Sequence, residues 1–238
     1  MNPEGLWLYS LCKKNDLYIT DIEIERLVHF KNLLLEWNKK INLVSRKNEE
    51  NIWKGHIVLS LSILFKIELR AGMKILDLGT GGGFPGIPLS IMLPDCSFLL
   101  LDSTQKKITA VQAMIDSLSL SNSKTVWGRA EDLHNRKELH QTFDTVVARS
   151  VSNLSNLLEW GLPFLKPCEG FGPLQNSPDK KVKIISSSLI TFKGGEIEEE
   201  ELAAKKKFPK VKLQTIPLTF HGSEEFENQD KKLVIATH

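Results

Sequence analysis

The chain has 238 residues, of which 41% are hydrophobic and 25% are charged, a composition typical of a globular protein with a sizeable core. This length fits one α/β domain with an accessory segment and leaves little room for two large domains. The net charge of +2 favours neither an acidic nor a strongly basic partner. Any nucleic-acid site must therefore come from local clusters of Lys and Arg.

Cysteine usage and hydropathy indicate a reducing, aqueous compartment. Cys12, Cys96 and Cys168 have neither zinc nor redox spacing, so we predict reduced thiols and no metal site. No basic segment followed by an apolar one opens the chain, and no apolar run approaches the roughly 18 residues of a membrane span. We expect a cytoplasmic protein with no membrane association, and no obligate protein partner is evident.

Residues 1–70 are predicted to form a helical segment that packs on the rest of the chain. Residues 20–41 have apolar side chains at helical spacing, and Thr20 with Glu23 forms a capping box at the beginning of this helix. A second helical stretch is predicted over residues 49–69. Both precede the first clear strand, so we expect them to form an N-terminal helical cap.

From residue 71 to residue 238, short apolar runs alternate with helical stretches. The runs are continuously apolar, as expected for strands buried on both faces, and helices separate them. This order predicts an α/β fold with a doubly wound, mostly parallel sheet. The predicted strands are 74–78, 97–101, 124–127 and 144–148, and the predicted helices are 87–93, 106–118 and 154–164.

The last third of the sequence is less regular. A helix is predicted over 196–207, where acidic residues come first and lysines last, an order that complements the helix dipole. Two β-rich runs follow at 211–220 and 231–237. The stretch 170–183 is rich in Gly, Pro, Asn, Ser and Lys and is predicted to be a loop insertion on the surface.

The strongest local signal is a glycine-rich turn after the first strand, where residues 77–86 read DLGTGGGFPG. Glycines such as Gly79 and Gly81 let the backbone turn sharply and approach a ligand closely. A turn of this kind occurs in dinucleotide-binding proteins and in methyltransferases. Asp77 lies inside the strand, where it would repel a pyrophosphate and attract the cationic amino-acid end of S-adenosylmethionine.

Two further acidic positions follow the next strands. Asp102 ends the second strand, where a carboxylate can accept hydrogen bonds from both ribose hydroxyls of NAD or of S-adenosylmethionine. Ala130 and Glu131 follow the third strand and can contact an adenine, although an acid there is also ordinary in the first turn of a helix. All of these positions lie at the carboxyl ends of strands, where ligands bind in such folds.

No motif for a catalytic nucleophile with its base is present in the sequence. An acceptor that needs no deprotonation suits this absence, and N7 of guanine is one, because positioning alone can lower its barrier by several kcal/mol. Arg149 follows the apolar run 146–148, where a charge seldom lacks a partner, so it is a candidate for cofactor or substrate contact. Basic candidates for RNA contact are Arg46, Lys106, Lys107 and Lys193.

The sequence resembles the ribosomal RNA small subunit methyltransferase G family, also called glucose-inhibited division protein B. Residues 77–88 are similar to the cofactor loop of that family, including an unusual Phe-Pro-Gly-Ile-Pro extension. The resemblance spans about residues 20 to 205, because further segments follow in the family's order at 37–43, 100–107, 129–131, 143–150, 165–167 and 192–194. It implies a Rossmann-like class I methyltransferase that uses S-adenosylmethionine to methylate guanine N7 in 16S rRNA, on the RNA or the small ribosomal subunit.

The resemblance also implies roles for individual residues. Arg149 and Lys193, with the basic residues after Asp102, are implied to face the RNA or the target base and to position it without a general base. Cofactor contacts are implied at Gly79, Phe84, Asp102, Ala130, Glu131 and Arg149.

The sequence departs from the family pattern at several positions. Leu59 replaces an acidic residue of a His-x-x-Asp-Ser-Leu motif, and Lys106-Lys107 replaces Lys-Arg, which weakens any bidentate phosphate contact. These departures leave open a non-enzymatic factor that binds the cofactor and takes part in RNA binding or ribosome assembly. A nicotinamide-dependent oxidoreductase is a second alternative, against which Asp77 and the missing proton donor argue.

Overall fold

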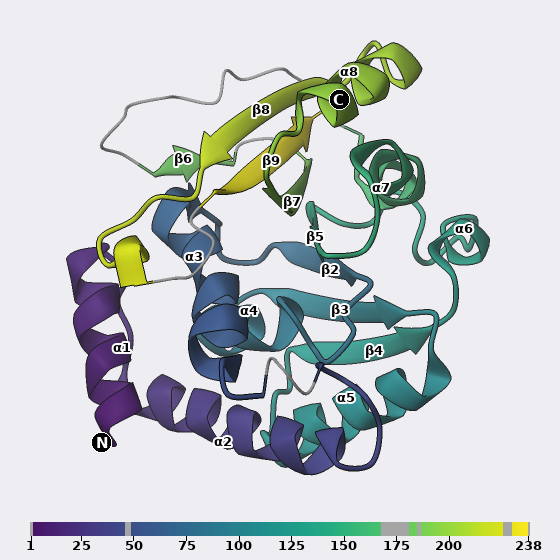
Figure 1. Ribbon diagram of the computed structural model, residues 1–238. Helices are drawn as coiled ribbons and strands as arrows, with labels where there is room; N and C mark the ends of the chain where they lie inside the picture. Colours follow the sequence, from purple (N-terminus) through teal and green to yellow (C-terminus); the bar gives the residue numbers. More distant parts are fainter. Residues whose placement is uncertain (1, 46–48, 168–180, 185–186, 226–229, 238) are drawn as a thin grey trace.

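The computed structural model of the chain describes residues 2–45, 49–167, 181–184, 187–225 and 230–237 (Figure 1). Its centre is a seven-stranded sheet with the strand order β4-β3-β2-β5-β7-β9-β8. The first five of these strands in spatial order are parallel, and β9 is antiparallel to both of its neighbours. The strands are β2 (Lys74–Leu78), β3 (Ser97–Asp102), β4 (Ser123–Trp127), β5 (Thr145–Arg149), β7 (Ser188–Gly194), β8 (Lys212–Pro217) and β9 (Lys231–Thr237).

The strand order places a topological switch point between β2 and β5. The chain begins the sheet at β2, runs outward through β3 to β4, and then returns to the other side of β2 as β5. In open parallel sheets, ligands bind outside the carboxyl ends of the strands at such a point. The predicted α/β fold with a doubly wound, mostly parallel sheet is confirmed, and so are the four predicted strands, each to within one residue at either end.

Helices cover both faces of the sheet and enclose two apolar cores. One core joins the N-terminal helices, α4 (Gly86–Met92) and α5 (Gln105–Ser117) to one face of the sheet. The other core joins α6 (Ala130–Leu133), α7 (Leu154–Gly161) and α8 (Glu198–Lys207) to the opposite face. Because side chains alternate along a strand, Ile75 of β2 enters the first core and Leu76 enters the second.

The N-terminal helices pack against the sheet on the side of α4 and α5. They are α1 (Pro3–Lys14), α2 (Asp21–Asn38), a π-helical turn η2 (Trp53–Val58) and α3 (Leu59–Lys66). The capping box at Thr20 is formed, since Glu23 N–H donates to Thr20 Oγ1 at 3.3 Å and Thr20 N–H donates to Glu23 Oε2 at 2.6 Å. The first predicted helix, 20–41, is therefore confirmed at its beginning, but it ends at Asn38, three residues earlier than predicted.

The second predicted helix, 49–69, was wrong at both ends. It begins as the π-helical turn η2, and α3 ends at Lys66 because the next two residues form β1 (Ile67–Glu68). β1 pairs in parallel with β6 (Val182–Lys183), more than a hundred residues later, and local periodicity cannot reveal such a partner. The rest of the predicted insertion at 170–183 lies outside the described residues, apart from Lys181 before β6.

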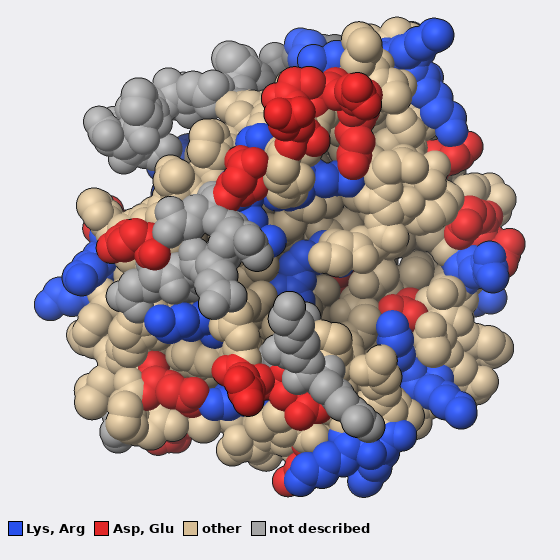
Figure 2. All heavy atoms as spheres, in the orientation of Figure 1, with Lys and Arg blue, Asp and Glu red and all other residues tan. Residues whose placement is uncertain are grey.

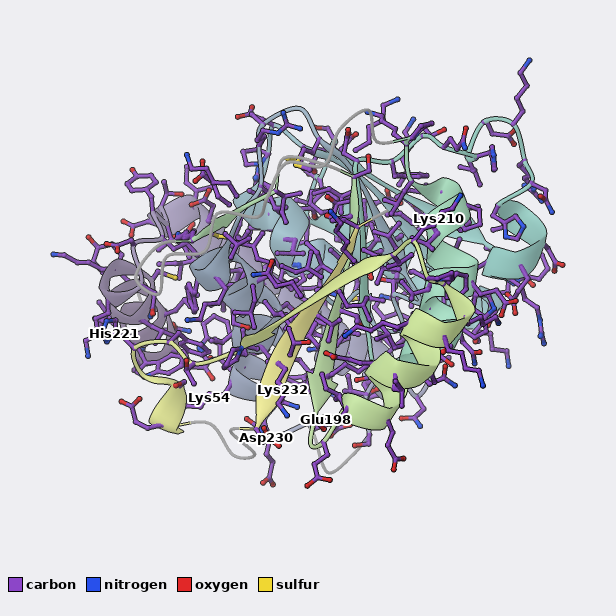
Figure 3. The ribbon with its side chains drawn as sticks, turned by 90° about the horizontal axis from the view of Figure 1, so that it is seen from above. Lys54, Glu198, Lys210, His221, Asp230 and Lys232 are labelled. Carbon is purple, nitrogen blue, oxygen red and sulfur yellow. The ribbon has the colours of Figure 1, made fainter. Side chains whose placement is uncertain are left out.

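The predicted helix at 196–207 and the β-rich runs at 211–220 and 231–237 correspond to α8, β8 and β9. In Figure 3 the beginning of α8, marked by Glu198, lies close to the beginning of β9, marked by Asp230 and Lys232. Since β9 is antiparallel to β7, its first residues lie at the carboxyl end of β7. This end of the sheet therefore carries residues from the tail as well. In the described part of the chain, no helix is long and apolar enough to span a membrane.

Candidate functional site

The glycine loop after β2 is joined to the end of β3 by backbone hydrogen bonds. The N–H groups of Gly79 and Thr80 donate to the Leu101 carbonyl at 2.8 and 2.9 Å. The N–H of Gly81 donates to Asp102 Oδ2 at 2.9 Å. Gly79 and Gly81 have φ values of +73° and +58°, which residues with a Cβ rarely adopt. The loop is thereby held in a fixed conformation beside Asp102 that glycine adopts without strain.

The two glycines serve this loop in different ways. A Cβ on Gly79 would lie 2.6 Å from Val151 Cγ2, so Gly79 allows close packing against the loop after β5. A Cβ on Gly81 would meet nothing within 4 Å. The left-handed backbone at Gly81 therefore borders open space above the sheet, which is the shape expected of a ligand cradle.

Asp77 is fully buried beneath this loop and fixes the beginning of α4. Its Oδ2 accepts the Gly86 N–H at 2.8 Å, and a Cβ on Gly86 would come within 2.5 Å of the same oxygen. Burial raises the pKa of Asp77 to about 7, although the Thr80 hydroxyl, the Gly86 N–H and Arg149 each lower it. Asp77 Oδ1 has no hydrogen-bond partner of good geometry among the described residues.

Asp102 lies at the carboxyl end of β3 with its carboxylate facing the loop. One oxygen accepts the Gly81 N–H, and the other accepts the Thr104 N–H at 2.8 Å. Each carboxylate oxygen can accept a further hydrogen bond. Asp102 can therefore hold the loop in place and still accept hydrogen bonds from two hydroxyls of a ribose.

Arg149 at the end of β5 is held by His56 of the π-helical turn. Its Nη1 donates to the His56 carbonyl at 3.2 Å, and its Nη2 lies 2.7 Å from His56 Nδ1. Because a guanidinium only donates, His56 Nδ1 accepts and the imidazole is neutral with its proton on Nε2. Burial, Arg149 and Lys231 lower the pKa of His56 to about 4, which favours this state.

The guanidinium of Arg149 has no carboxylate within ion-pair distance among the described residues. It lies over the Phe84 ring, 4.8 Å from the centroid. Burial lowers the pKa of Arg149 to about 10, and the nearby Asp77 opposes this shift. A partly buried cation of this kind, beside a glycine loop, can pair with an anionic group of a ligand.

Phe84 links the N-terminal helices to the site. Its ring packs edge-on against Phe30 of α2 at 5.2 Å and lies 5.1 Å from the His56 ring. The sequence analysis missed the roles of Phe30 and His56, although His56 begins the motif whose acidic residue is replaced by Leu59. Only contacts between distant segments reveal that this part of the cap contributes to the site.

Lys193 lies at the carboxyl end of β7 but is already paired. Its Nζ lies 2.7 Å from Glu200 Oε2 of α8 and donates to the Ser152 carbonyl at 2.9 Å, and its side chain is 11% exposed. Glu200 Oε2 also accepts the Leu154 N–H at 3.0 Å, at the beginning of α7. The sequence implied only that Lys193 faces the RNA or the target base, and it did not indicate this ion pair.

The remaining predicted site residues differ in how exposed their side chains are. Ala130 is buried and Glu131 is exposed in the first turn of α6. Lys106 is exposed and Lys107 partly exposed in the first turn of α5, while Arg46 lies outside the described residues. Figure 2 shows a hollow in this face of the molecule, with Lys and Arg side chains along its wall. The described residues contain no cluster of His, Cys, Asp and Glu that could hold a metal ion.

Comparison with known proteins identifies the family. Residues 23–201 match the family model for rRNA small subunit methyltransferase G. The chain belongs to this family. It is 43% identical over 193 residues to ribosomal RNA small subunit methyltransferase G of Chlorobium limicola, covering 81% of this chain and 77% of the relative. The protein of the same name from Pelodictyon phaeoclathratiforme is 38% identical and covers 99% of this chain and 94% of its own.

Solved structures agree on the fold. A SAM-dependent methyltransferase from Aquifex aeolicus has a TM-score of 0.51 at 16% identity, covering 74% of this chain and 88% of its own. A fibrillarin/Nop5p complex has a TM-score of 0.52 at 13% identity, and the match covers 81% of this chain and 80% of that chain. The prediction of an S-adenosylmethionine-dependent methyltransferase is confirmed by family membership, and the oxidoreductase alternative is set aside.

Proposed function

We propose that this protein transfers the methyl group of S-adenosylmethionine to N7 of a guanine in 16S rRNA, on the RNA or the small ribosomal subunit. The observation that carries the proposal is the cradle formed by the glycine loop. Gly81 borders open space, Asp102 faces the loop, and Arg149, which forms no ion pair with any described residue, lies at the neighbouring strand end. The substrate itself is inferred from the names of the relatives.

Several residues fit the cofactor, which supplies an electrophilic methyl group on a sulfonium when bound. Asp102 would accept the ribose hydroxyls, and Ala130 with Glu131 would contact the adenine. The methionine end of the cofactor would be lined by Gly79, Gly81 and Phe84. Asp77 would fix the glycine loop and would favour the positive charge at the amino-acid end of S-adenosylmethionine. Arg149 would pair with the carboxylate of the methionine moiety.

The chemistry on the acceptor requires alignment and no proton removal, because N7 of guanine carries a free lone pair at neutral pH. The hydrogen bonds that fix the loop and Arg149 serve this alignment, which can supply several kcal/mol of the barrier. Lys193 would contact the guanine O6 or a phosphate after release from Glu200, and Lys106 and Lys107 would contact the RNA backbone. Arg46 is a further candidate for backbone contact.

The test is methyl transfer to purified small ribosomal subunits and to 16S rRNA from cells that lack this protein. We expect label from the cofactor's methyl group to enter the RNA at one guanine, which becomes sensitive to reductive strand cleavage at that position. Asp102→Ala serves as the matched control, because its weaker cofactor binding should lower methyl transfer when the cofactor is limiting. Binding of S-adenosylmethionine by calorimetry, with no methyl transfer to either substrate, would instead favour the non-enzymatic assembly factor.

A further inference from the structure

An exposed tryptophan lies beside the cofactor cradle, outside the predicted machinery. Trp127 is the last residue of β4, directly opposite Asp102 in the register of β3 and β4, and it is 54% exposed. Its indole Nε1 donates to the Ser103 carbonyl at 3.0 Å, which fixes the ring over the loop that leads from β3 to α5. The indole therefore presents an exposed face to solvent in a fixed orientation beside the cradle.

The alternation of β4 places this ring on the same side of the sheet as α5. Thr125, two residues earlier, donates to Gln112 of α5 at 2.8 Å, whereas Val126 packs against the opposite core. Trp127 therefore lies near the beginning of α5, where Lys106 and Lys107 occupy the first turn.

Three cations come from the segments next to Trp127: Lys106 and Lys107 in the first turn of α5, and Arg129 two residues after Trp127. In the parts of the chain that the structure describes, Lys106, Lys107 and Arg129 form no ion pair. Lysines in the first turn of a helix face the positive end of its dipole, so they do not serve the stability of α5. The neighbouring α6 has the opposite, ordinary arrangement, with Glu131 and Asp132 in its first turn. Figure 2 shows basic side chains over the end of β4 and the beginning of α5.

We propose that Trp127, with Lys106, Lys107 and Arg129, forms a stacking platform for an unpaired RNA base next to the methylated guanine. Aromatic side chains bind single-stranded RNA by stacking on its bases, and the surrounding cations contact its phosphates. This inference rests on the proposed function for the identity of the RNA, but the platform itself is defined by these four residues.

The adenine of the cofactor is the competing occupant, because Trp127 lies next to Asp102. The distribution of charge on the cofactor argues against adenine as the group that stacks on Trp127. S-adenosylmethionine carries its one carboxylate at the methionine end, near Arg149, and no phosphate at the adenine end. The three cations near Trp127 in the chain and fold, which form no ion pair with any described residue, therefore have no group to meet on the cofactor, whereas the phosphates on both sides of a stacked nucleotide match them.

The experiment compares Trp127→Ala, Trp127→Phe and Tyr18→Ala in the full-length protein. Tyr18 is 84% exposed and precedes α2, away from the strand ends, so its removal controls for loss of any surface aromatic ring. Three quantities are measured: the dissociation constant for a fluorescein-labelled single-stranded RNA 20-mer of mixed sequence, the dissociation constant for S-adenosylmethionine, and the rate of small-subunit methylation.

We expect Trp127→Ala to weaken RNA binding at least fivefold, with cofactor affinity within twofold of wild type. Trp127→Phe and Tyr18→Ala should stay within about twofold in both measurements, since phenylalanine still stacks. Unchanged RNA affinity in Trp127→Ala overturns the platform, and a loss confined to cofactor affinity assigns the ring to the adenine instead. RNA binding is measured directly, so the two proposals can fail separately. If the wild-type protein binds RNA through Trp127 but methylates no subunit, the proposed function is contradicted and the platform is not.

Discussion

Replacing Gly81 with alanine tests whether the cofactor occupies the space beside this residue. The new side chain strains the backbone, which lowers stability, and it fills part of the space, which lowers cofactor affinity. A residue with a Cβ costs about 1 to 2 kcal/mol in the left-handed conformation that Gly81 adopts. Restriction of the unfolded chain returns about 0.4 to 1 kcal/mol of this. We expect Gly81→Ala to lower the free energy of unfolding by about 1 kcal/mol, because its new methyl group contacts nothing in the protein.

Gly72 provides a matched control. It precedes β2 at the opposite end from the loop, has a φ of +79°, and a Cβ there would also meet nothing within 4 Å. Gly72→Ala therefore introduces the same strain in the same kind of open surroundings. We expect the two variants to lose similar stability in urea unfolding.

The two variants should differ sharply in cofactor affinity. A methyl group inside an occupied cradle overpacks it at a cost of about 1 to 3 kcal/mol, so Gly81→Ala should bind S-adenosylmethionine at least fivefold more weakly by calorimetry. Gly72→Ala should bind it as wild type does. If both variants lose about 1 kcal/mol of stability and both bind the cofactor within twofold of wild type, the space above Gly81 is not where the cofactor lies.

Three further predictions follow from the hydrogen bonds of the site. Asp102→Ala should weaken cofactor binding by about 2 kcal/mol in calorimetry, and an unchanged affinity in a folded variant would reject the ribose assignment. The pKa of His56 is about 4 when folded and 6.5 otherwise, so its stabilising effect is complete above pH 6.5 and is lost as pH falls toward 4. Between pH 7 and pH 4, the free energy of unfolding should fall in both proteins, but the fall should be smaller in His56→Gln than in wild type by on the order of 2 kcal/mol. Parallel pH profiles of the two proteins would contradict this. Lys193→Ala should slow single-turnover methylation tenfold or more at saturating cofactor while Glu200→Gln does not, and equal losses in both variants would give Lys193 a purely structural role.

Strands and helices of the core could be predicted because their signals are local. Continuous apolar runs mark strands buried on both faces, and the capping box at Thr20 marks the beginning of α2 within one residue. α1 was missed although its signals are present, since Asn2 caps it and Pro3 begins it. The end of α3 could not be predicted, because β1 depends on a partner strand far along the chain.

A residue of the candidate site could be predicted only where its position along a strand determines where it lies in the fold. Asp102 follows from its place at a strand end, and Asp77 from its place in β2 just before the glycine loop; a parallel sheet brings these positions to one edge. The contact between Arg149 and His56 joins residues 93 apart, and nothing local indicates it. The pairing of Lys193 with Glu200 depends on how α8 packs against the sheet edge, which the charge pattern of α8 does not determine.

The position of β9 has a consequence for how the protein forms during synthesis. β9 is the last strand in the sequence, yet it lies between β7 and β8 in the sheet. Until residues 231–237 leave the ribosome, β8 has no hydrogen-bonding neighbour in the sheet and the buried edge of β7 stays open. Unpaired edges of this kind promote association with other chains. Nascent chains halted before residue 231 should therefore be the aggregation-prone species, whereas the strands that carry the glycine loop and Asp102 are already able to pair.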